Sequence, residues 1–237
     1  MIAAINGFHF RVVDNDFWPY FNGDWESDTK RLYAKYARPD RTIIDVGAWI
    51  GPTVLIGYAH NAKHIYAVEA DPLNAHTLRL NCGNNYLDDR VTIINRCIHD
   101  RSHEVFSFGN SICESDSSTH TFGGRHKVLS STLMDIIADN AIALPEVGLI
   151  KIDIEGSELL LVRDLKKLAA HKHLVVLLSL HQQFWKKIPA KEEALRVLFG
   201  CYDFFTAAEE EPIPTESLDR YIQENIHCLL VMKPKVR

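Results

Sequence analysis

The sequence lacks the features of membrane proteins and of disulfide-stabilised proteins. No apolar stretch approaches the roughly twenty residues of a membrane span, and the opening residues 1–5 are too short for a signal peptide. The 5 cysteines are widely spaced and contain no C-x-x-C pair, so they suggest neither a zinc site nor a disulfide framework. We therefore expect a soluble, cytoplasmic protein with reduced thiols.

Negative charge exceeds positive charge, with 31 Asp and Glu residues against 26 Lys and Arg residues. The formal net charge is -5, whereas affinity for nucleic acid depends on clustered Lys and Arg side chains that neutralise phosphates. We therefore expect no nucleic-acid partner, and we expect the acidic run 209–211 to be a solvated turn. The 237 residues, 46% of them apolar, fit a single domain over 1–237, without an internal repeat or a long linker.

Short aliphatic runs alternate with helical patterns along the chain. This alternation is typical of a mostly parallel sheet with helices on both faces, so the predicted fold class is α/β and Rossmann-like. The polar, turn-forming stretch 100–130 predicts an insertion of loops and short strands. The predicted strands are 42–46, 65–69, 91–94, 147–153, 174–180, 202–207 and 227–232, and the predicted helices are 52–59, one opening at Asp71-Pro72, 155–169 and 191–199.

The first predicted strand runs into a glycine-rich turn, Asp45-Val46-Gly47-Ala48-Trp49-Ile50-Gly51. Glycine lets the backbone bend and approach a ligand closely, and the start of the following helix adds N–H donors. The next strand ends at Glu69, whose carboxylate can accept both hydroxyls of a ribose, as in dinucleotide folds. Together they predict a nucleotide-type cofactor pocket. An NAD enzyme remains the alternative, although G-A-W-I-G departs from the dinucleotide pattern G-x-G-x-x-G.

Three carboxylates come at the end of a strand candidate, in the string Lys151-Ile152-Asp153-Ile154-Glu155-Gly156-Ser157-Glu158. Asp153 and His181 end neighbouring strand candidates and are acid–base candidates, with His181 the better base because its ordinary pKa suits neutral pH. Alternatively, Asp153, Glu155 and His181 hold Mg²⁺, which would lower the pKa of a substrate hydroxyl. Glu155 and Glu158 can also simply favour the positive end of a helix.

Five motifs, in matching order, resemble the FkbM-type methyltransferases. They are W-E-S-D-T at 25–29, the turn D-V-G-A-x-x-G, V-E-A-D-P at 68–72, S-T-L-M-D at 131–135 and K-I-D-I-E-G-S-E, within residues 25–207. The resemblance implies a class I methyltransferase with a seven-stranded sheet, an antiparallel C-terminal strand and S-adenosylmethionine as donor, usually to a hydroxyl. Relatives often carry a glutamate where this chain has Ser179, and Trp49 is bulky for its turn.

The positions at the strand ends and the resemblance together give the candidate site residues. Asp153, His181 and Glu155 are the candidates for catalysis, and residues 1–40 are expected to cover the substrate and the cofactor. The implied cofactor-binding residues are Glu26, Asp45, Gly47, Ala48, Trp49, Gly51, Glu69, Ala70, Asn95, Cys97 and Asp153.

The predicted function is an S-adenosylmethionine-dependent O-methyltransferase that acts on a hydroxyl of a small molecule or a carbohydrate. The alternatives are methylation of a nitrogen or another acceptor, an NAD-dependent oxidoreductase, and a cofactor-binding protein without turnover. The sequence has no N-P-P-Y-type string, which argues against methylation of nucleic-acid bases.

Overall fold

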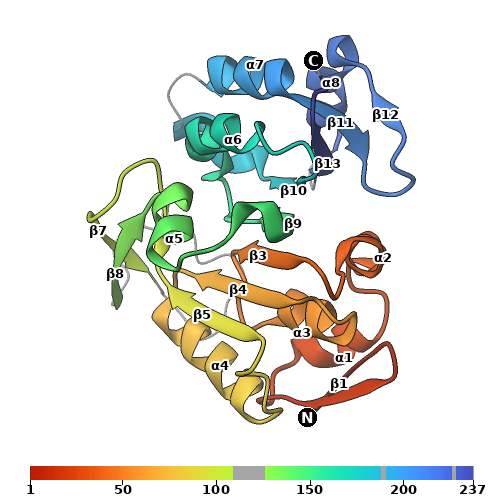
Figure 1. Ribbon diagram of the computed structural model, residues 1–237, viewed down its shortest axis with the longest axis vertical. Helices are drawn as coiled ribbons and strands as arrows, with labels where there is room; N and C mark the ends of the chain where they lie inside the picture. Colours follow the sequence, from red (N-terminus) through yellow and green to blue (C-terminus); the bar gives the residue numbers. More distant parts are fainter. Residues whose placement is uncertain (109–125, 188–190, 226–227, 237) are drawn as a thin grey trace.

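The computed structural model describes residues 1–108, 126–187, 191–225 and 228–236 of the chain (Figure 1). Its centre is an eight-stranded sheet in the order β12-β11-β13-β10-β9-β3-β4-β5. The strands are β3 (Thr42–Val46), β4 (His64–Glu69), β5 (Val91–Asn95), β9 (Val147–Ile152), β10 (Val175–Leu180), β11 (Tyr202–Thr206), β12 (Pro212–Ile213) and β13 (Cys228–Pro234).

The pairing of these strands confirms the predicted α/β sheet. β5, β4, β3, β9 and β10 are parallel neighbours, whereas β13 lies antiparallel to both β10 and β11. The sheet has one strand more than the predicted seven, because Pro212 and Ile213 pair antiparallel with β11 at the edge. Two residues are too few to produce the alternating pattern by which a strand is recognised.

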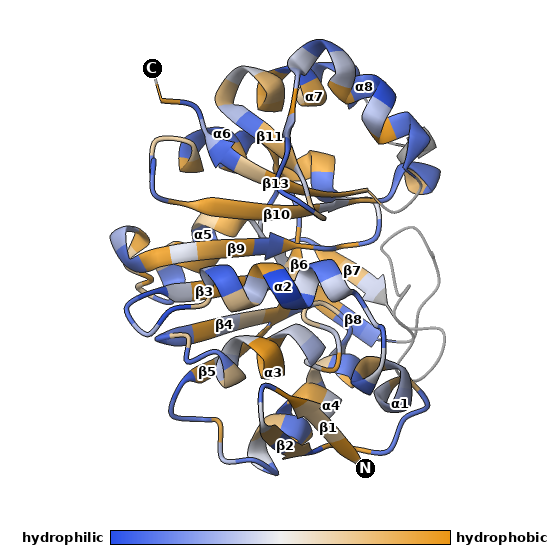
Figure 2. Ribbon diagram, turned by 90° about the vertical axis from the view of Figure 1, so that its right-hand side faces the viewer, coloured by the Kyte–Doolittle hydropathy of each residue, from blue (hydrophilic) through white to orange (hydrophobic). Residues whose placement is uncertain are grey.

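Helices cover both faces of the sheet, which gives two hydrophobic cores. The side chains of β10 belong alternately to one core and to the other. Val176, Leu178 and Leu180 belong to one core and Val175 and Leu177 to the other, since successive side chains of a strand point to opposite faces. Figure 2 shows β10 as a mostly hydrophobic strand. One core contains residues of α5 (Leu133–Asp139), α6 (Val162–Leu168), α7 (Lys191–Cys201) and α8 (Thr215–Glu224), and the other contains residues of α1 (Phe17–Asn22), α2 (Ser27–Tyr36), α3 (Pro52–Ala59) and α4 (Pro72–Gly83).

Two smaller sheets accompany the central one. An antiparallel hairpin and a three-stranded sheet in the order β6-β8-β7 are formed by β1 (Ile2–Ile5), β2 (Phe8–Arg11), β6 (Cys97–Ile98), β7 (Val105–Phe108) and β8 (His126–Ser131). The stretch 100–130 thus contains β7 and all of β8 except Ser131, while its residues 109–125 lie outside the described residues. Within the described ranges, no helix is long and apolar enough to span a membrane.

One predicted helix begins later than its pattern indicates. The pattern starts at Glu155, but Glu155 and Gly156 have positive φ angles of 52° and 99° and leave the helical region. A short 3₁₀ turn, Glu158–Leu161, then leads into α6. A Cβ atom at Gly156 would lie 2.3 Å from the Cβ atom of Phe184, so the backbone of this loop packs directly against the segment after β10.

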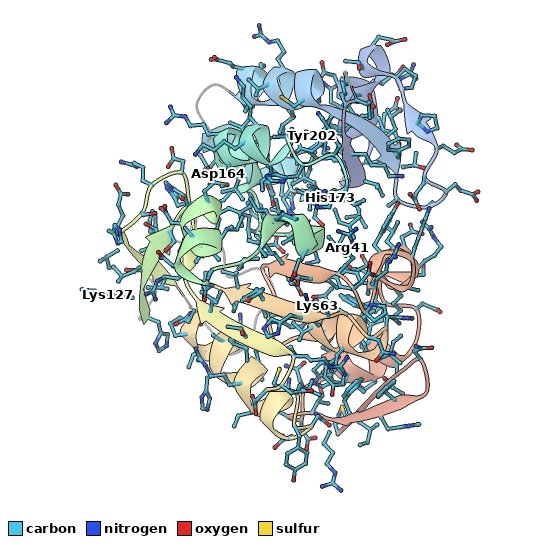
Figure 3. The ribbon with its side chains drawn as sticks, viewed as in Figure 1. Arg41, Lys63, Lys127, Asp164, His173 and Tyr202 are labelled. Atoms are coloured by element: carbon cyan, nitrogen blue, oxygen red, sulfur yellow. The ribbon has the colours of Figure 1, made fainter. Side chains whose placement is uncertain are left out.

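Polar contacts tie the amino ends of the strands together (Figure 3). The turn Leu144–Glu146 before β9 accepts three hydrogen bonds from side chains that precede other strands. The donors are Arg41 before β3 at 2.8 Å, Lys63 before β4 at 2.6 Å and His173 before β10 at 3.2 Å. These three contacts fix the amino edge of the sheet. None of these three side chains lies at the opposite, carboxyl edge of the sheet. Ligands bind at that edge in folds of this type.

A glycine draws three carboxyl ends together. Gly47 has a φ angle of 84°, and a Cβ atom there would lie 1.8 Å from the carbonyl oxygen of Asp153. The N–H groups of Gly47 and Ala48 donate to the Val68 carbonyl at 2.9 and 3.0 Å, and the N–H of Asp153 donates to the Val46 carbonyl at 3.0 Å. Only glycine allows the ends of β3, β4 and β9 to meet this closely.

In the acidic run 209–211, Glu209 and Glu211 are exposed, as expected for a solvated turn, but Glu210 is not. The side chain of Glu210 is only 8% exposed and pairs with Lys35 of α2 at 2.5 Å and with Lys233 of β13 at 3.2 Å. Tyr36 donates a hydrogen bond to the same carboxylate. Partial burial would raise the pKa of Glu210, but these hydrogen bonds lower it to about 2. The carboxylate therefore ties α2 to the C-terminal strands.

We expect Gly47→Ala to destabilise the protein far more than Gly7→Ala. Both glycines have positive φ angles, 84° and 78°, so alanine costs about 1–2 kcal/mol of backbone strain at either position. A Cβ atom at Gly7 meets nothing within 4 Å, whereas the one at Gly47 collides with Asp153. This overpacking adds roughly 1–3 kcal/mol or more. Urea unfolding measures the difference, and equal losses would contradict the close contact.

Glu210→Gln should lower the free energy of unfolding at pH 7 by about 1–2 kcal/mol. This loss is larger than that of an exposed ion pair and smaller than that of several hydrogen bonds to a buried charge. Glu209→Gln, at an exposed neighbouring position, is the control and should change little. Because the pKa of Glu210 is lowered, its contribution is lost as the pH falls from about 4.5 through about 2. A wild-type advantage that persists unchanged at pH 2 in urea unfolding would contradict this.

Candidate active site

The carboxyl ends of the parallel strands border two cavities. One of about 540 Å³ lies against the turn after β3, and one of about 440 Å³ lies against the end of β10 and the start of β13. We call them the β3 cavity and the β10 cavity. Glu26, Asp153 and His181 line both, together with Tyr20 and Trp25 of the N-terminal segment. The predicted site residues Glu26, Asp153 and His181 are thus brought together where the two cavities adjoin.

The glycine turn forms one wall of the β3 cavity. Gly47, Ala48 and Trp49 line it, and Trp49 has a positive φ angle of 50°. The indole ring packs edge-on against Phe17 of α1, with ring centroids 4.6 Å apart. The bulky side chain in this turn therefore joins the strand edge to the N-terminal segment. Gly51, with a φ angle of 102°, ends the turn and precedes α3.

Glu69 ends β4 beside this turn. One carboxylate oxygen accepts a hydrogen bond from the N–H of Trp49 and the other from the N–H of Asp71, both at 2.8 Å. Glu69 is 7% exposed. Burial raises the pKa of Glu69 to about 7, although the two backbone hydrogen bonds oppose this rise. The strand end therefore carries a firmly held carboxyl group that titrates near neutral pH.

The ends of β4 and β5 meet around Asn95. Its side-chain amide donates to the carbonyls of Glu69 at 2.8 Å and Ala70 at 3.0 Å. Cys97 is buried in a small cluster with Ala70, and burial raises the pKa of its thiol to about 12. Four of the predicted cofactor-binding residues thus share this corner, although none of them lines the β3 or the β10 cavity.

A buried lysine lies in the wall of the β3 cavity. The Nζ atom of Lys151 is 3.1 Å from Asp153 and 3.9 Å from Asp45. Asp45 is completely buried and also accepts a hydrogen bond from Thr53 at 2.5 Å. Burial would lower the pKa of Lys151, but Asp153 and Asp45 raise it, so the lysine stays charged. Asp45 thus supports Lys151 from within the protein and is not itself part of the cavity wall.

Glu26 reaches both cavities from the N-terminal side. It has a φ angle of 38° just before α2, and its Oε2 accepts a hydrogen bond from Thr29 at 2.7 Å. Enclosure by the surrounding protein raises the pKa of Glu26, Lys151 lowers it, and Asp153 adds to the rise. Glu26 therefore adds a carboxylate to a cleft that already holds Asp153 and Glu155.

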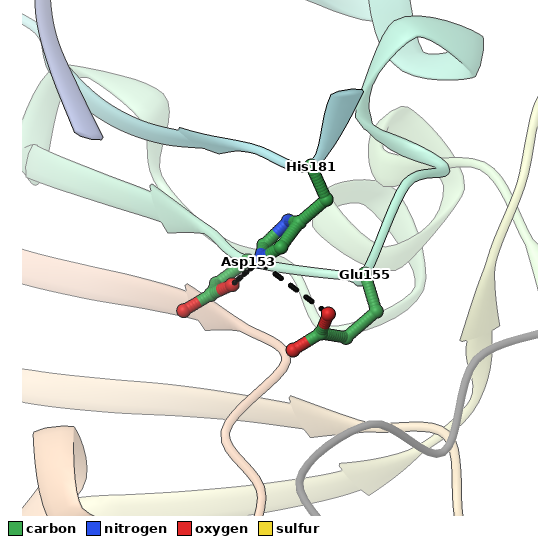
Figure 4. A group of neighbouring side chains, drawn as sticks. All are labelled: Asp153, Glu155 and His181. Carbon is green, nitrogen blue, oxygen red and sulfur yellow. Dashed lines mark ion pairs between the residues drawn. The ribbon is translucent and has the colours of Figure 1, made fainter. Parts of the chain in front are cut away.

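His181 lies among three carboxylates directly after β10 (Figure 4). Its Nε2 is 3.5 Å from an oxygen of Asp153 and 3.4 Å from an oxygen of Glu155. On the other side of the ring, Nδ1 is hydrogen-bonded to Glu158 at 2.8 Å. Glu158 is completely buried. Its carboxylate is therefore occupied by the histidine and does not act only as a charge at a helix start, as the sequence pattern allowed.

The carboxylates change the proton affinity of His181. Burial alone would lower the pKa of His181, but the hydrogen bond with Glu158 and the neighbouring charges, chiefly that of Asp153, raise it to about 9. The imidazole is therefore protonated in the free protein at neutral pH. This corrects the sequence argument that the ordinary pKa of histidine suits it to act as a base, because the carboxylates gather around the ring only in the fold.

Asp153, Glu155 and His181 also fit a divalent cation. Each offers a ligand atom, and these atoms lie within 4.8 Å of one another. Carboxylate oxygens are the ligands that Mg²⁺ prefers, and a histidine whose other nitrogen bonds to a carboxylate is common at metal sites. The three predicted ligands are thus close enough to act together.

Three polar residues of the site carried no separate prediction. Lys151 lies two positions before Asp153 and so on the same strand face, which is the signal that identifies it. Glu158 has only the signal of a helix start. Ser179, where relatives often carry glutamate, donates a hydrogen bond to Asp153. Phe184 lines the β3 cavity, whereas the side chain of the neighbouring residue 185 lies outside the described part of the chain.

Comparison with known proteins agrees with this architecture. The family model of the methyltransferase FkbM domain matches residues 45–205. The solved methyltransferase FkbM from Methylobacillus flagellatus KT has a TM-score of 0.50 at 16% identity, over 82% of this chain and 44% of that chain. Cofactor-bound Rv0187 from MTB has a TM-score of 0.50 at 11% identity, over 89% of this chain and 81% of that chain. Likeness at such low identity supports the fold alone.

A curated relative matches a shorter part of the sequence. The protein named "Probable histone-arginine methyltransferase CARM1" from Oryza sativa subsp. indica is 43% identical over 54 residues, or 23% of this chain. The chain spans about a tenth of the length of that relative. The match to the FkbM domain, by contrast, spans more than half of the chain and includes the glycine turn, Glu69, Asp153 and His181. This chain therefore belongs to the FkbM methyltransferase family.

Proposed function

We propose that the chain is an S-adenosylmethionine-dependent O-methyltransferase that acts on a hydroxyl group of a small molecule or a carbohydrate. The observation that carries this proposal is the setting of His181, which lines both cavities with Nε2 between Asp153 and Glu155 while Glu158 holds Nδ1. An imidazole with one nitrogen held and the other directed at a substrate is suited to removing a proton from a hydroxyl.

The β3 side of the cleft suits the methyl donor. S-adenosylmethionine supplies a methyl group on a cationic sulfur. The glycine turn lets the ligand approach the backbone at the start of α3, and Glu69 can accept hydrogen bonds from the two ribose hydroxyls. The adenine is assigned to the corner beyond Glu69. The residues assigned to the donor on this side are Gly47, Ala48, Trp49, Gly51, Glu69, Ala70, Asn95 and Cys97.

Opposite charges suit the amino-acid end of the donor. Glu26 can bind its ammonium group, while Lys151 supplies positive charge for its carboxylate and is braced by Asp45. Asp153 lies at the boundary of the two cavities, next to the transferred methyl group. Residues 1–40 are assigned a covering role, supported by the contribution of Tyr20 and Glu26 to both cavities.

A hydroxyl is not acidic at neutral pH, so its methylation benefits from a group that takes the proton. In the free protein the raised pKa of His181, about 9, keeps the imidazole protonated. A cationic donor bound beside the ring opposes the effect of the carboxylates and favours the neutral imidazole. For this base, kcat/KM rises with pH toward about 9.

The β10 cavity suits an uncharged acceptor with many hydroxyls. Tyr20 and Trp25 offer aromatic faces to a sugar ring, and Ser27, Thr29 and Ser179 offer hydroxyl groups. Among the described residues that line this cavity, none is Lys or Arg. A phosphate group on the acceptor would therefore lack a cationic partner of the kind that usually binds phosphate.

Binding of Mg²⁺ is a second candidate role for the same side chains, favoured by ligand atoms within 4.8 Å of one another. The ion would be held by Asp153, Glu155 and His181 and would lower the pKa of the acceptor hydroxyl. The ion pair between Asp153 and Lys151 at 3.1 Å argues for the proton-transfer role, because a cation already neutralises that carboxylate.

Transfer to nitrogen is the alternative on the acceptor side. The name of the rice relative states a histone arginine acceptor, but its match covers only 23% of this chain. The acceptor of that protein is therefore not carried over. A cofactor-binding protein without turnover would retain donor binding and show no methyl transfer in the assay described below.

Glu69→Gln should weaken binding of S-adenosylhomocysteine by about 10- to 100-fold, because the ribose loses a charged acceptor. The pKa of Glu69 is raised to about 7, so wild-type affinity should fall as the pH decreases below 7 and the carboxylate takes up a proton. Calorimetric titration between pH 6 and pH 8 measures both effects. Glu104→Gln, outside both cavities, is the control. Unchanged affinity in Glu69→Gln would remove Glu69 from the site.

His181→Ala should reduce methyl transfer at least about 100-fold and leave donor affinity nearly intact, as expected for loss of a general base. The assay follows labelled methyl groups onto neutral methyl glycosides and their phosphorylated counterparts, of which only the neutral ones should react. His173→Ala, at the amino edge of the sheet, is the matched control and should remain active. Near-normal turnover of His181→Ala would end its proposed role. Loss of wild-type turnover in EDTA, restored by Mg²⁺, would assign the cluster to the cation.

A further inference from the structure

We infer that Glu158 is a positioning residue for His181. Its carboxylate keeps the neutral imidazole in the tautomer with the proton on Nδ1, and so leaves the lone pair of Nε2 for the acceptor hydroxyl. The catalytic consequence rests on the proposed methyl transfer, whereas the tautomer is a property of the protein without any ligand.

We assign the proton of the neutral ring to Nδ1 from the hydrogen bond between Nδ1 and Glu158. An ionised carboxylate only accepts hydrogen bonds, so the contact of 2.8 Å between Glu158 and Nδ1 requires a proton on Nδ1. When the ring is neutral, Nε2 is then the unprotonated nitrogen. Nε2 is the atom that lies nearest Asp153 and Glu155, in the wall shared by the two cavities.

Neighbouring backbone contacts hold Glu158 in this position. Its Oε1 also accepts a hydrogen bond from the N–H of Gly156 at 2.9 Å. Gly156 packs against Phe184, and the N–H of Phe184 donates to the carbonyl of His181 at 3.1 Å. These contacts form a closed ring of four residues. The imidazole is therefore fixed through its side chain by Glu158 and through its backbone by Phe184.

Glu158 differs in its surroundings from the other two carboxylates near the ring. Asp153 and Glu155 line the β3 cavity, whereas Glu158 is completely buried and lines neither cavity. Within the described part of the chain, its second oxygen, Oε2, has no hydrogen-bond partner. Burying a carboxylate in this way is costly. The hydrogen bond with His181 accounts for this buried carboxylate, because a loop residue with only a structural role would not require one.

Nitrogen NMR of isotope-labelled histidine tests the tautomer without substrate. The protein has 12 histidines, so the His181 signal is assigned by its loss in His181→Gln. At a pH where the nitrogen shifts show a neutral ring, the wild type should carry its proton on Nδ1. Glu158→Gln keeps an oxygen for both N–H groups and should keep this tautomer, whereas Glu158→Ala should lose it. A wild-type proton on Nε2 would overturn the inference, even if Glu158→Ala does not fold.

Kinetics test the consequence for catalysis. Glu158→Ala should lower kcat about 10- to 100-fold, the effect typical of losing a carboxylate that orients a functional histidine, with unchanged affinity for S-adenosylhomocysteine. Glu158→Gln should recover part of this loss. The control is Asp164→Asn, which alters a buried carboxylate bonded to the backbone of Met134 and should change neither the tautomer nor kcat. Normal kcat and tautomer in Glu158→Ala would contradict the inference, whereas a wild type that transfers no methyl group would contradict only the proposed function.

Discussion

The packing of Gly47 directly against the backbone of Asp153 is the contact on which the cleft depends. Because no side chain separates them, the ends of β3 and β9 lie within hydrogen-bond distance, with the N–H of Asp153 donating to Val46 at 3.0 Å. The glycine turn that borders the β3 cavity and the carboxylate that borders both cavities are therefore neighbours. A donor bound along the turn would consequently lie beside Asp153 and His181, the residues proposed to act on the acceptor.

The charges of the cleft are coupled through Asp153. It lies 3.1 Å from Lys151 on one side and 3.5 Å from His181 on the other. Each of these cations also faces a buried carboxylate, Asp45 behind Lys151 and Glu158 behind His181. Removing either cation would leave a buried carboxylate without its positive partner, which lowers stability. The carboxylates of these pairs also raise the pKa values of Lys151 and His181.

Elements that depend on neighbours in the chain were predictable from the sequence. The aliphatic run before Gly47 predicts β3, and Pro52 predicts the start of α3, because both signals are local. Contacts between distant segments were not predictable in this way. Glu158 has the pattern of a helix-start charge, and only the fold brings it to His181, 23 positions away. Glu210 likewise belongs to an acidic run, and its positively charged partners lie on α2 and β13.

Calorimetric titration of the intact protein with S-adenosylhomocysteine, and separately with NADH, tests most directly whether the cleft belongs to a methyltransferase. The glycine turn and Glu69 predict binding of S-adenosylhomocysteine in the micromolar range. No binding of NADH is expected, because the turn lacks the three-glycine pattern that receives a pyrophosphate. Failure of the folded protein to bind S-adenosylhomocysteine, together with binding of NADH, would contradict the assignment of the cleft.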